Sequence, residues 1–94
     1  MNAENDTALA GVRSSIDSID RQIVALIAER QRWVLAAGSL KKTEDGVRAP
    51  ARVEQVIGKV RALAEAAGAS PALVESTYRA MIGAFIELEL QSLE

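Results

Sequence analysis

Residues 9–40 read LAGVRSSIDSIDRQIVALIAERQRWVLAAGSL, and this stretch decides the fold. Its apolar residues recur at the a and d positions of a heptad repeat, which is the pattern of an α-helix that packs along one face. One row holds Leu9, Ile16, Ile23 and Ala37, and the other holds Val12, Ile19, Leu26 and Trp33. We expect one helix over about residues 7–40. About 30 residues at 1.5 Å each span roughly 45 Å, so the stripe predicts a partner helix from a second chain.

The rest of the chain predicts two shorter helices. Residues 41–49 (KKTEDGVRA) are mostly polar and contain Gly46, so we expect a loop there. Pro50 suits the first turn of a helix over about residues 50–67, and Gly68 suits its end. Ser70 followed by Pro71 then begins a helix over about residues 71–92. The expected architecture is a single all-α domain over residues 1–94, with three helices and a long first one, intertwined as a homodimer.

Composition excludes several classes of function. Eleven basic and 13 acidic residues give a net charge of −2, so nothing indicates binding to nucleic acid. The chain has no cysteine and no histidine, so it lacks a thiolate nucleophile, the commonest general base and the commonest metal ligand. We therefore expect neither a metal nor a cofactor. No apolar run reaches the roughly 20 residues of a membrane span, and no signal peptide is evident, which predicts a cytoplasmic protein.

Arg30 breaks the stripe, because it occupies an a position between Ile23 and Ala37. A guanidinium group keeps its charge, so burial requires an anionic partner. That partner could be a carboxylate in a buried salt bridge or a bound anion. Alternatively, the side chain reaches solvent at the edge of the stripe or fixes the register of paired helices.

Three other charged residues border the apolar faces. Arg13 and Arg52 could be ordinary surface arginines or parts of an anion site, and Glu89 could pair with Arg30 or face solvent. Arg13 and Arg30 are about 26 Å apart along one helix and point about 100° apart. They cannot both contact one small ligand from the same chain, but in an antiparallel dimer Arg13 of one chain could approach Arg30 of the other. A cage of Arg and Lys with one carboxyl suits electrostatic stabilisation of an anionic transition state without a covalent step.

The pattern resembles the all-helical, AroQ-type chorismate mutase family, which includes isochorismate-pyruvate lyases. The first helix carries L-x-x-V-R-x-x-I-D-x-I-D-x-x-I-V-x-L-I-A-E-R from Leu9 to Arg30, and Lys41 follows at the place of the family's active-site lysine. The segment V-R-A-P-A-R-V, residues 47–53, resembles the loop and the start of the second helix, with Arg52 at the family's arginine. The similarity covers nearly the whole chain.

The resemblance implies roles for these residues. Arg30 and a partner chain's Arg13 would bind the two carboxylates of a small dicarboxylate substrate. Lys41 would hydrogen-bond the ether oxygen and a carboxylate, and Arg52 would help to close the site. Glu89 stands where bacterial mutases have a glutamine that donates to the ether oxygen, and fungal members of the family resemble this chain in having a glutamate there. A carboxyl group donates only when protonated, so either burial must favour the protonated form or activity must favour acid.

Departures from the family leave the substrate open. Typical mutases have acidic residues at the positions of Ala49 and Val53, and a serine at the position of Phe85. The leading hypothesis is conversion of chorismate to prephenate, in aromatic amino acid biosynthesis. The alternatives are an isochorismate-pyruvate lyase that forms salicylate, a mutase of 4-amino-4-deoxychorismate, and a non-catalytic helical dimer that binds a protein.

Overall fold

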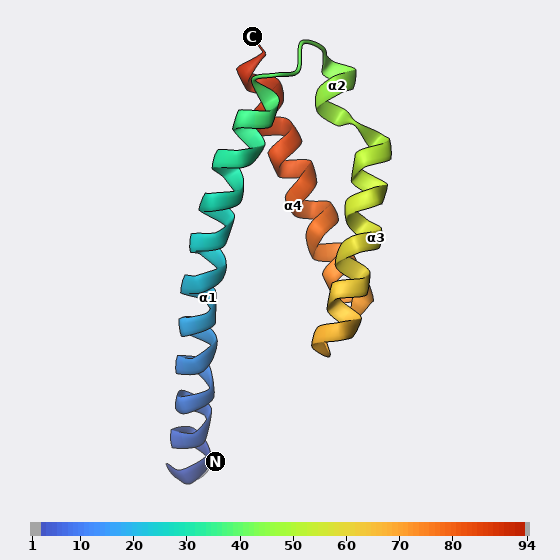
Figure 1. Cartoon of the computed structure of the whole chain (residues 1–94). Helices are drawn as coiled ribbons and strands as arrows, with labels where there is room; N and C mark the ends of the chain where they lie inside the picture. Colours follow the sequence, from blue (N-terminus) through green and yellow to red (C-terminus); the bar gives the residue numbers. More distant parts are fainter. Residues whose placement is uncertain (1–2, 94) are drawn as a thin grey trace. The chain divides into compact units, whose positions relative to one another are not determined.

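The computed structural model describes residues 3–93, and every element within them is helical, as the sequence predicts (Figure 1). The elements are α1 (Ala3–Gly38), α2 (Glu44–Arg48), α3 (Pro50–Ala67) and α4 (Pro71–Ser92). The chain divides into two compact units, Met1–Trp33 and Val34–Glu94, so the boundary falls inside α1. Among the described residues, no helix is long and apolar enough to cross a membrane.

Within the described residues, the first unit is the part of α1 that ends at Trp33. The helix begins at Ala3 rather than near residue 7, and Glu4 and Asp6 in its first turn complement the positive end of the helix dipole. None of its residues is buried within the chain. The large apolar residues of the predicted stripe are all exposed, from 42% for Leu9 to 72% for Trp33. A single chain therefore leaves the a and d face of this helix open to solvent.

The second unit begins with the last turn of α1 and contains a helix that the sequence analysis missed. Residues 41–49 were predicted as a loop, which is wrong for residues 44–48, because these form α2. Thr43 caps this helix, since its Oγ1 accepts a hydrogen bond from the backbone N–H of Gly46 at 3.0 Å. Val47 is buried, at 3% exposure, and α2 packs on α4. This contact gives the mostly polar segment an apolar anchor on α4.

Helices α3 and α4 form an antiparallel pair that lies side by side (Figure 1). Both have the bounds that the sequence predicts, because their end signals are local. Ser70 Oγ accepts from the N–H of Leu73 at 3.2 Å, and Gly68 adopts a φ of 80° that favours glycine. The buried apolar residues of the pair are Ile57, Val60, Ala64 and Phe85.

An ion network joins the outer faces of the same two helices. Arg79 on α4 donates two hydrogen bonds of 2.8 Å to the carboxylate of Glu54 on α3. It also donates to Glu75, which accepts from Arg61 at 2.7 Å. The hydrogen bonds from Arg79 are the largest cause that lowers the pKa of both Glu54 and Glu75 below the ordinary value. The bonds of Arg79 with Glu54 and of Arg61 with Glu75 cross between α3 and α4 and hold the register of the two helices, whereas the bond of Arg79 with Glu75 lies within α4.

Candidate active site

The centre of the candidate site is an ion pair between Lys41 and Glu89. Lys41 Nζ lies 3.2 Å from Glu89 Oε2 and donates a hydrogen bond to it. The two residues are 48 positions apart in sequence. Lys41 follows the end of α1, and Glu89 lies in the last turns of α4. The fold thus brings together two residues that the sequence analysis assigned to catalysis.

Glu89 is the one buried charged or polar residue among the described part of the chain, at 6% exposure. Burial of an ionised carboxylate is costly unless a cation or several donors compensate it. Lys41 supplies that charge, and its own side chain is 30% exposed. One partner is thus enclosed in the protein, while the other reaches the solvent from which a ligand would arrive.

The end of α1 forms the surroundings of this pair. The backbone N–H of Lys41 donates to the carbonyl of Gly38 at 3.0 Å, and the N–H of Leu40 donates to Ala37 at 3.1 Å. These short-range bonds tighten the chain as the helix ends. A Cβ on Gly38 would lie 2.9 Å from Glu89 Oε2. Gly46 of α2 lies against the side-chain stem of Lys41, since a Cβ on Gly46 would be 3.7 Å from the Cβ of Lys41.

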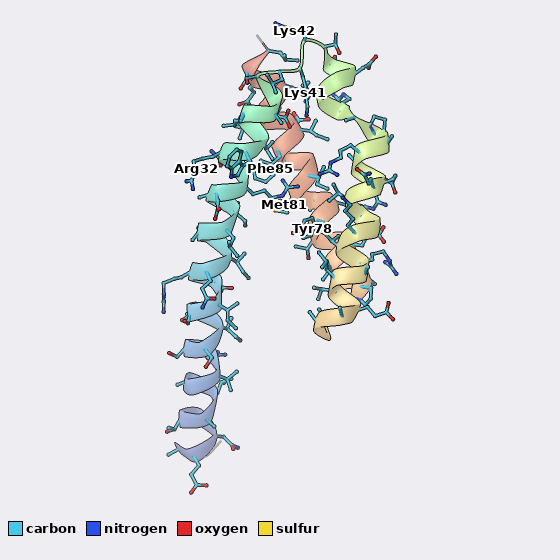
Figure 2. The ribbon with its side chains drawn as sticks, viewed as in Figure 1. Arg32, Lys41, Lys42, Tyr78, Met81 and Phe85 are labelled. Carbon is cyan, nitrogen blue, oxygen red and sulfur yellow. The ribbon has the colours of Figure 1, made fainter. Side chains whose placement is uncertain are left out.

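Phe85 is buried on α4, one helical turn before Glu89 (Figure 2). Ala49 and Val53 are half-buried at the start of α3, and the N–H of Val53 donates to the carbonyl of Ala49 at 3.1 Å. Ala49 has a φ of 37° and a ψ of 61°, which is left-handed backbone in a residue with a Cβ. The corner between α2 and α3 therefore carries local strain.

Arg52 is exposed, and its NH1 donates to Gln55 Oε1 on the same helix at 2.7 Å. It is thus held along α3 and does not contribute to the Lys41–Glu89 contact. Arg13 and Arg30 belong to the first unit, where Arg13 is exposed and Arg30 is half-buried. Arg30 already takes part in a hydrogen bond, an ion pair or another electrostatic or ring interaction. Their assignment to a substrate site stays a prediction.

The arrangement suits electrostatic chemistry. A lysine ammonium group and a buried carboxyl group meet at one point, so two hydrogen-bond donors would face a ligand oxygen there if Glu89 were protonated. Within residues 3–93, no group of three or more acidic, histidine or cysteine residues could hold a metal ion.

Sequence reasoning missed two residues that build this site. Gly38 was assigned no role in the sequence analysis, and nothing local shows that Glu89 would lie on it. Val47 was placed in a loop, although Thr43 followed by Glu44 and Asp45 is a typical helix start that could have revealed α2.

Comparison with known proteins identifies the family of the chain. The profile of the family described as chorismate mutase type II matches residues 12–90. The chain is also similar to an isochorismate pyruvate lyase of Pseudomonas aeruginosa, with 32% identity over 88 residues. That alignment covers 94% of this chain and 87% of the relative. The matched region includes every residue of the candidate site.

Proposed function

The chain belongs to the type II chorismate mutase family, and on that premise we propose that it converts chorismate to prephenate. In this rearrangement the bond between the ring and the ether oxygen breaks. A bond forms at the same time between the enolpyruvyl methylene and the ring carbon that bears the carboxylate. No atom enters or leaves, and no covalent intermediate with the protein is needed. The protein has only to bind the dianion in a folded shape and to stabilise charge on the ether oxygen.

The observation that carries this proposal is the contact between Lys41 and Glu89. In the proposed complex the ammonium group of Lys41 and the protonated carboxyl of Glu89 both donate to the ether oxygen. Loss of one such donor typically costs about 10²- to 10³-fold in kcat. Phe85, Ala49 and Val53 line the ring in the same proposal, and Arg52 leaves Gln55 to help close the site.

The two substrate carboxylates require further cations, and we assign them to Arg30 and to Arg13 of a second copy. The exposed stripe of α1 supports a homodimer, because Val12 is 56% exposed, Ile19 52% and Leu26 62%. Burial of such a continuous apolar face is favourable at about 25 cal/mol per Å². An antiparallel pairing of the long helices would bring Arg13 of one copy toward Arg30 of the other.

The first experiment measures turnover of chorismate by Arg30→Ala, with Arg32→Ala as the matched control. Arg32 is exposed two residues further along α1 (Figure 2). We expect Arg30→Ala to abolish turnover while the dimer persists in size-exclusion chromatography, and Arg32→Ala to remain active. Full activity in Arg30→Ala would overturn the proposed site.

A mixing experiment tests the sharing of sites between copies. Arg13→Ala and Arg30→Ala should each be inactive as homodimers. A mixed dimer holds one site in which both arginines are intact, so unfolding and refolding the two variants together should restore activity. Continued inactivity of the mixture, with mixed dimers demonstrated by mass, would contradict a shared site.

An isochorismate-pyruvate lyase is the second candidate. It is favoured by the similarity to the Pseudomonas lyase and by apolar residues at Ala49 and Val53. In that reaction the same kind of ether bond breaks while a ring hydrogen moves to the enolpyruvyl methylene, which yields salicylate and pyruvate. Comparison of kcat/KM on isochorismate, chorismate and 4-amino-4-deoxychorismate distinguishes the candidates. Turnover of none of the three substrates would favour the remaining alternative, a non-catalytic helical dimer that binds a protein.

Each candidate activity has its own cellular setting. We propose a place in aromatic amino acid biosynthesis for the mutase and in salicylate formation for the lyase, both in the cytoplasm and with neither metal nor cofactor.

A further inference from the structure

Gly38 has no backbone reason to be glycine. The described residues with positive φ are Ala49 and Gly68, so Gly38 does not adopt the left-handed conformation that commonly ends a helix at glycine. It is the last residue of α1, where alanine would favour the helix more. The explanation must come from the space around its Cα.

That space is occupied by the Glu89 carboxyl group. A Cβ on Gly38 would lie 2.9 Å from Oε2 and 3.4 Å from both Cδ and Cγ of Glu89. The first distance is shorter than carbon and oxygen atoms tolerate without a bond. The carboxyl group of Glu89 therefore occupies the space that a side chain at position 38 would need.

The same glycine also contacts Lys41. Its carbonyl oxygen accepts the backbone N–H of Lys41 at 3.0 Å, which sets where the lysine leaves the end of the helix. Gly38 thus touches both members of the ion pair, one through its backbone and the other through the absence of a side chain.

We propose that Gly38 is the positioning residue of the site: its missing side chain lets the Glu89 carboxyl reach Lys41. The role in turnover rests on the proposed function, while the geometric claim stands without it. A methyl group at position 38 pushes the carboxyl away from Lys41 Nζ and from the place of the ether oxygen. The end of the Glu89 side chain is flexible, so it moves more easily than the backbone. In Gly38→Ala we therefore expect the fold to be kept and the contact between Lys41 Nζ and Glu89 Oε2 to be lost.

The test compares Gly38→Ala with Gly58→Ala. Gly58 is also a helical glycine, on α3, and a Cβ there would meet no atom within 4 Å. Because displacement by about 1 Å can cost on the order of 10²-fold in rate, we expect kcat of Gly38→Ala to fall about 10- to 100-fold. KM should change little, because the arginines that bind the carboxylates are untouched. Gly58→Ala should match the wild type in rate and melt at or above its temperature. Gly38→Ala should stay folded but melt at a lower temperature, because the buried Glu89 carboxyl loses its contact with Lys41.

A second pair of variants isolates the contact. In a Glu89→Ala background there is no carboxyl to displace, so adding Gly38→Ala should leave kcat where Glu89→Ala alone puts it. An equal loss in both backgrounds would overturn the proposal, as would wild-type kcat in Gly38→Ala.

A crystal structure of Gly38→Ala separates this proposal from the proposed function. The distance from Lys41 Nζ to Glu89 Oε2 should exceed hydrogen-bond reach there. If the wild type turns over none of the candidate substrates, the proposed function fails, and this distance still decides the positioning role. An intact ion pair in the variant overturns that role whatever the activity.

Discussion

Replacement of Lys41 by methionine tests whether the ion pair stabilises the fold as well as the transition state. Methionine has a similar length and fills the same space, but it carries no charge. In Lys41→Met the carboxylate of Glu89 stays at 6% exposure with its cation removed. The protein must then hold a buried charge without compensation, take up a proton at the carboxyl group or open the end of α4 to water, and each of these has a cost.

The magnitude follows from the geometry of the pair. At 3.2 Å and an effective dielectric constant of about 20, two unit charges attract by about 5 kcal/mol. Desolvation of both groups offsets most of this attraction, so the intact pair adds little net stability. Removal of one partner of a buried pair nevertheless costs about 3–5 kcal/mol. Because Lys41 is 30% exposed, water already screens the pair, and we expect a loss of about 2–3 kcal/mol.

Urea unfolding at neutral pH and one fixed protein concentration measures this loss, since the stability of a dimer depends on concentration. Lys42→Met is the matched control, because Lys42 is the exposed neighbour (Figure 2) and surface substitutions usually stay within about 0.5 kcal/mol. The double variant Lys41→Met with Glu89→Gln should recover most of the loss, because no buried charge remains. A cost of Lys41→Met no larger than that of Lys42→Met would refute the reasoning, and so would a double variant whose cost is the sum.

Three further predictions concern pH and backbone strain. The wild-type rate should fall as the pH rises, because only a protonated Glu89 donates, and Glu89→Gln should flatten the kcat profile; a flat wild-type profile removes the donor role. Hydrogen bonds from Arg79 lower the pKa of Glu54 and Glu75, so their contribution is present above about pH 4.5 and lost as the pH falls below it. Thermal unfolding across this range should show a smaller loss in Arg79→Ala, and an equal loss would contradict the network's role. Ala49→Gly should raise the free energy of unfolding by up to about 1 kcal/mol, because it relieves the left-handed strain; a loss in urea unfolding would show that the methyl contact matters more.

The helices were predictable wherever their signals are local. Pro50, Gly68, Ser70 and Pro71 mark starts and ends within one turn of chain, and α3 and α4 have the bounds that these residues indicate. Segment 41–49 failed because its helix depends on Val47, which is buried by packing of α2 on α4. A five-residue helix is not stable by itself, so its presence is a tertiary effect that polarity alone conceals.

The candidate site was predictable in its members but not in their contacts. The resemblance to the chorismate mutase family supplied Lys41 and Glu89, whereas local reasoning about Glu89 considered only Arg30 or solvent as its surroundings. The structure pairs Glu89 with Lys41, which is 48 residues earlier in the sequence. Helices α2 and α3 and most of α4 separate the two residues along the chain, and the reversal between α3 and α4 brings them together. No periodicity within one helix could reveal this contact or the place of Gly38 beneath it.

The apolar residues at the start of α3 set a limit on substrate selectivity. Ala49 and Val53 offer no side-chain acceptor for a ring hydroxyl, and Ala49 directly precedes α3 while Val53 lies in its first turn. A pocket that hydrogen-bonds a substrate hydroxyl rejects analogues without it by about 10⁴- to 10⁵-fold, whereas an apolar pocket discriminates by only about 10²-fold. If these residues face the ring as proposed, kcat/KM for chorismate, isochorismate and the amino analogue should lie within about 10² of one another. A ratio above 10⁴ would mean that another polar group reads the ring, and the assignment of Ala49 and Val53 to the ring pocket would then be wrong.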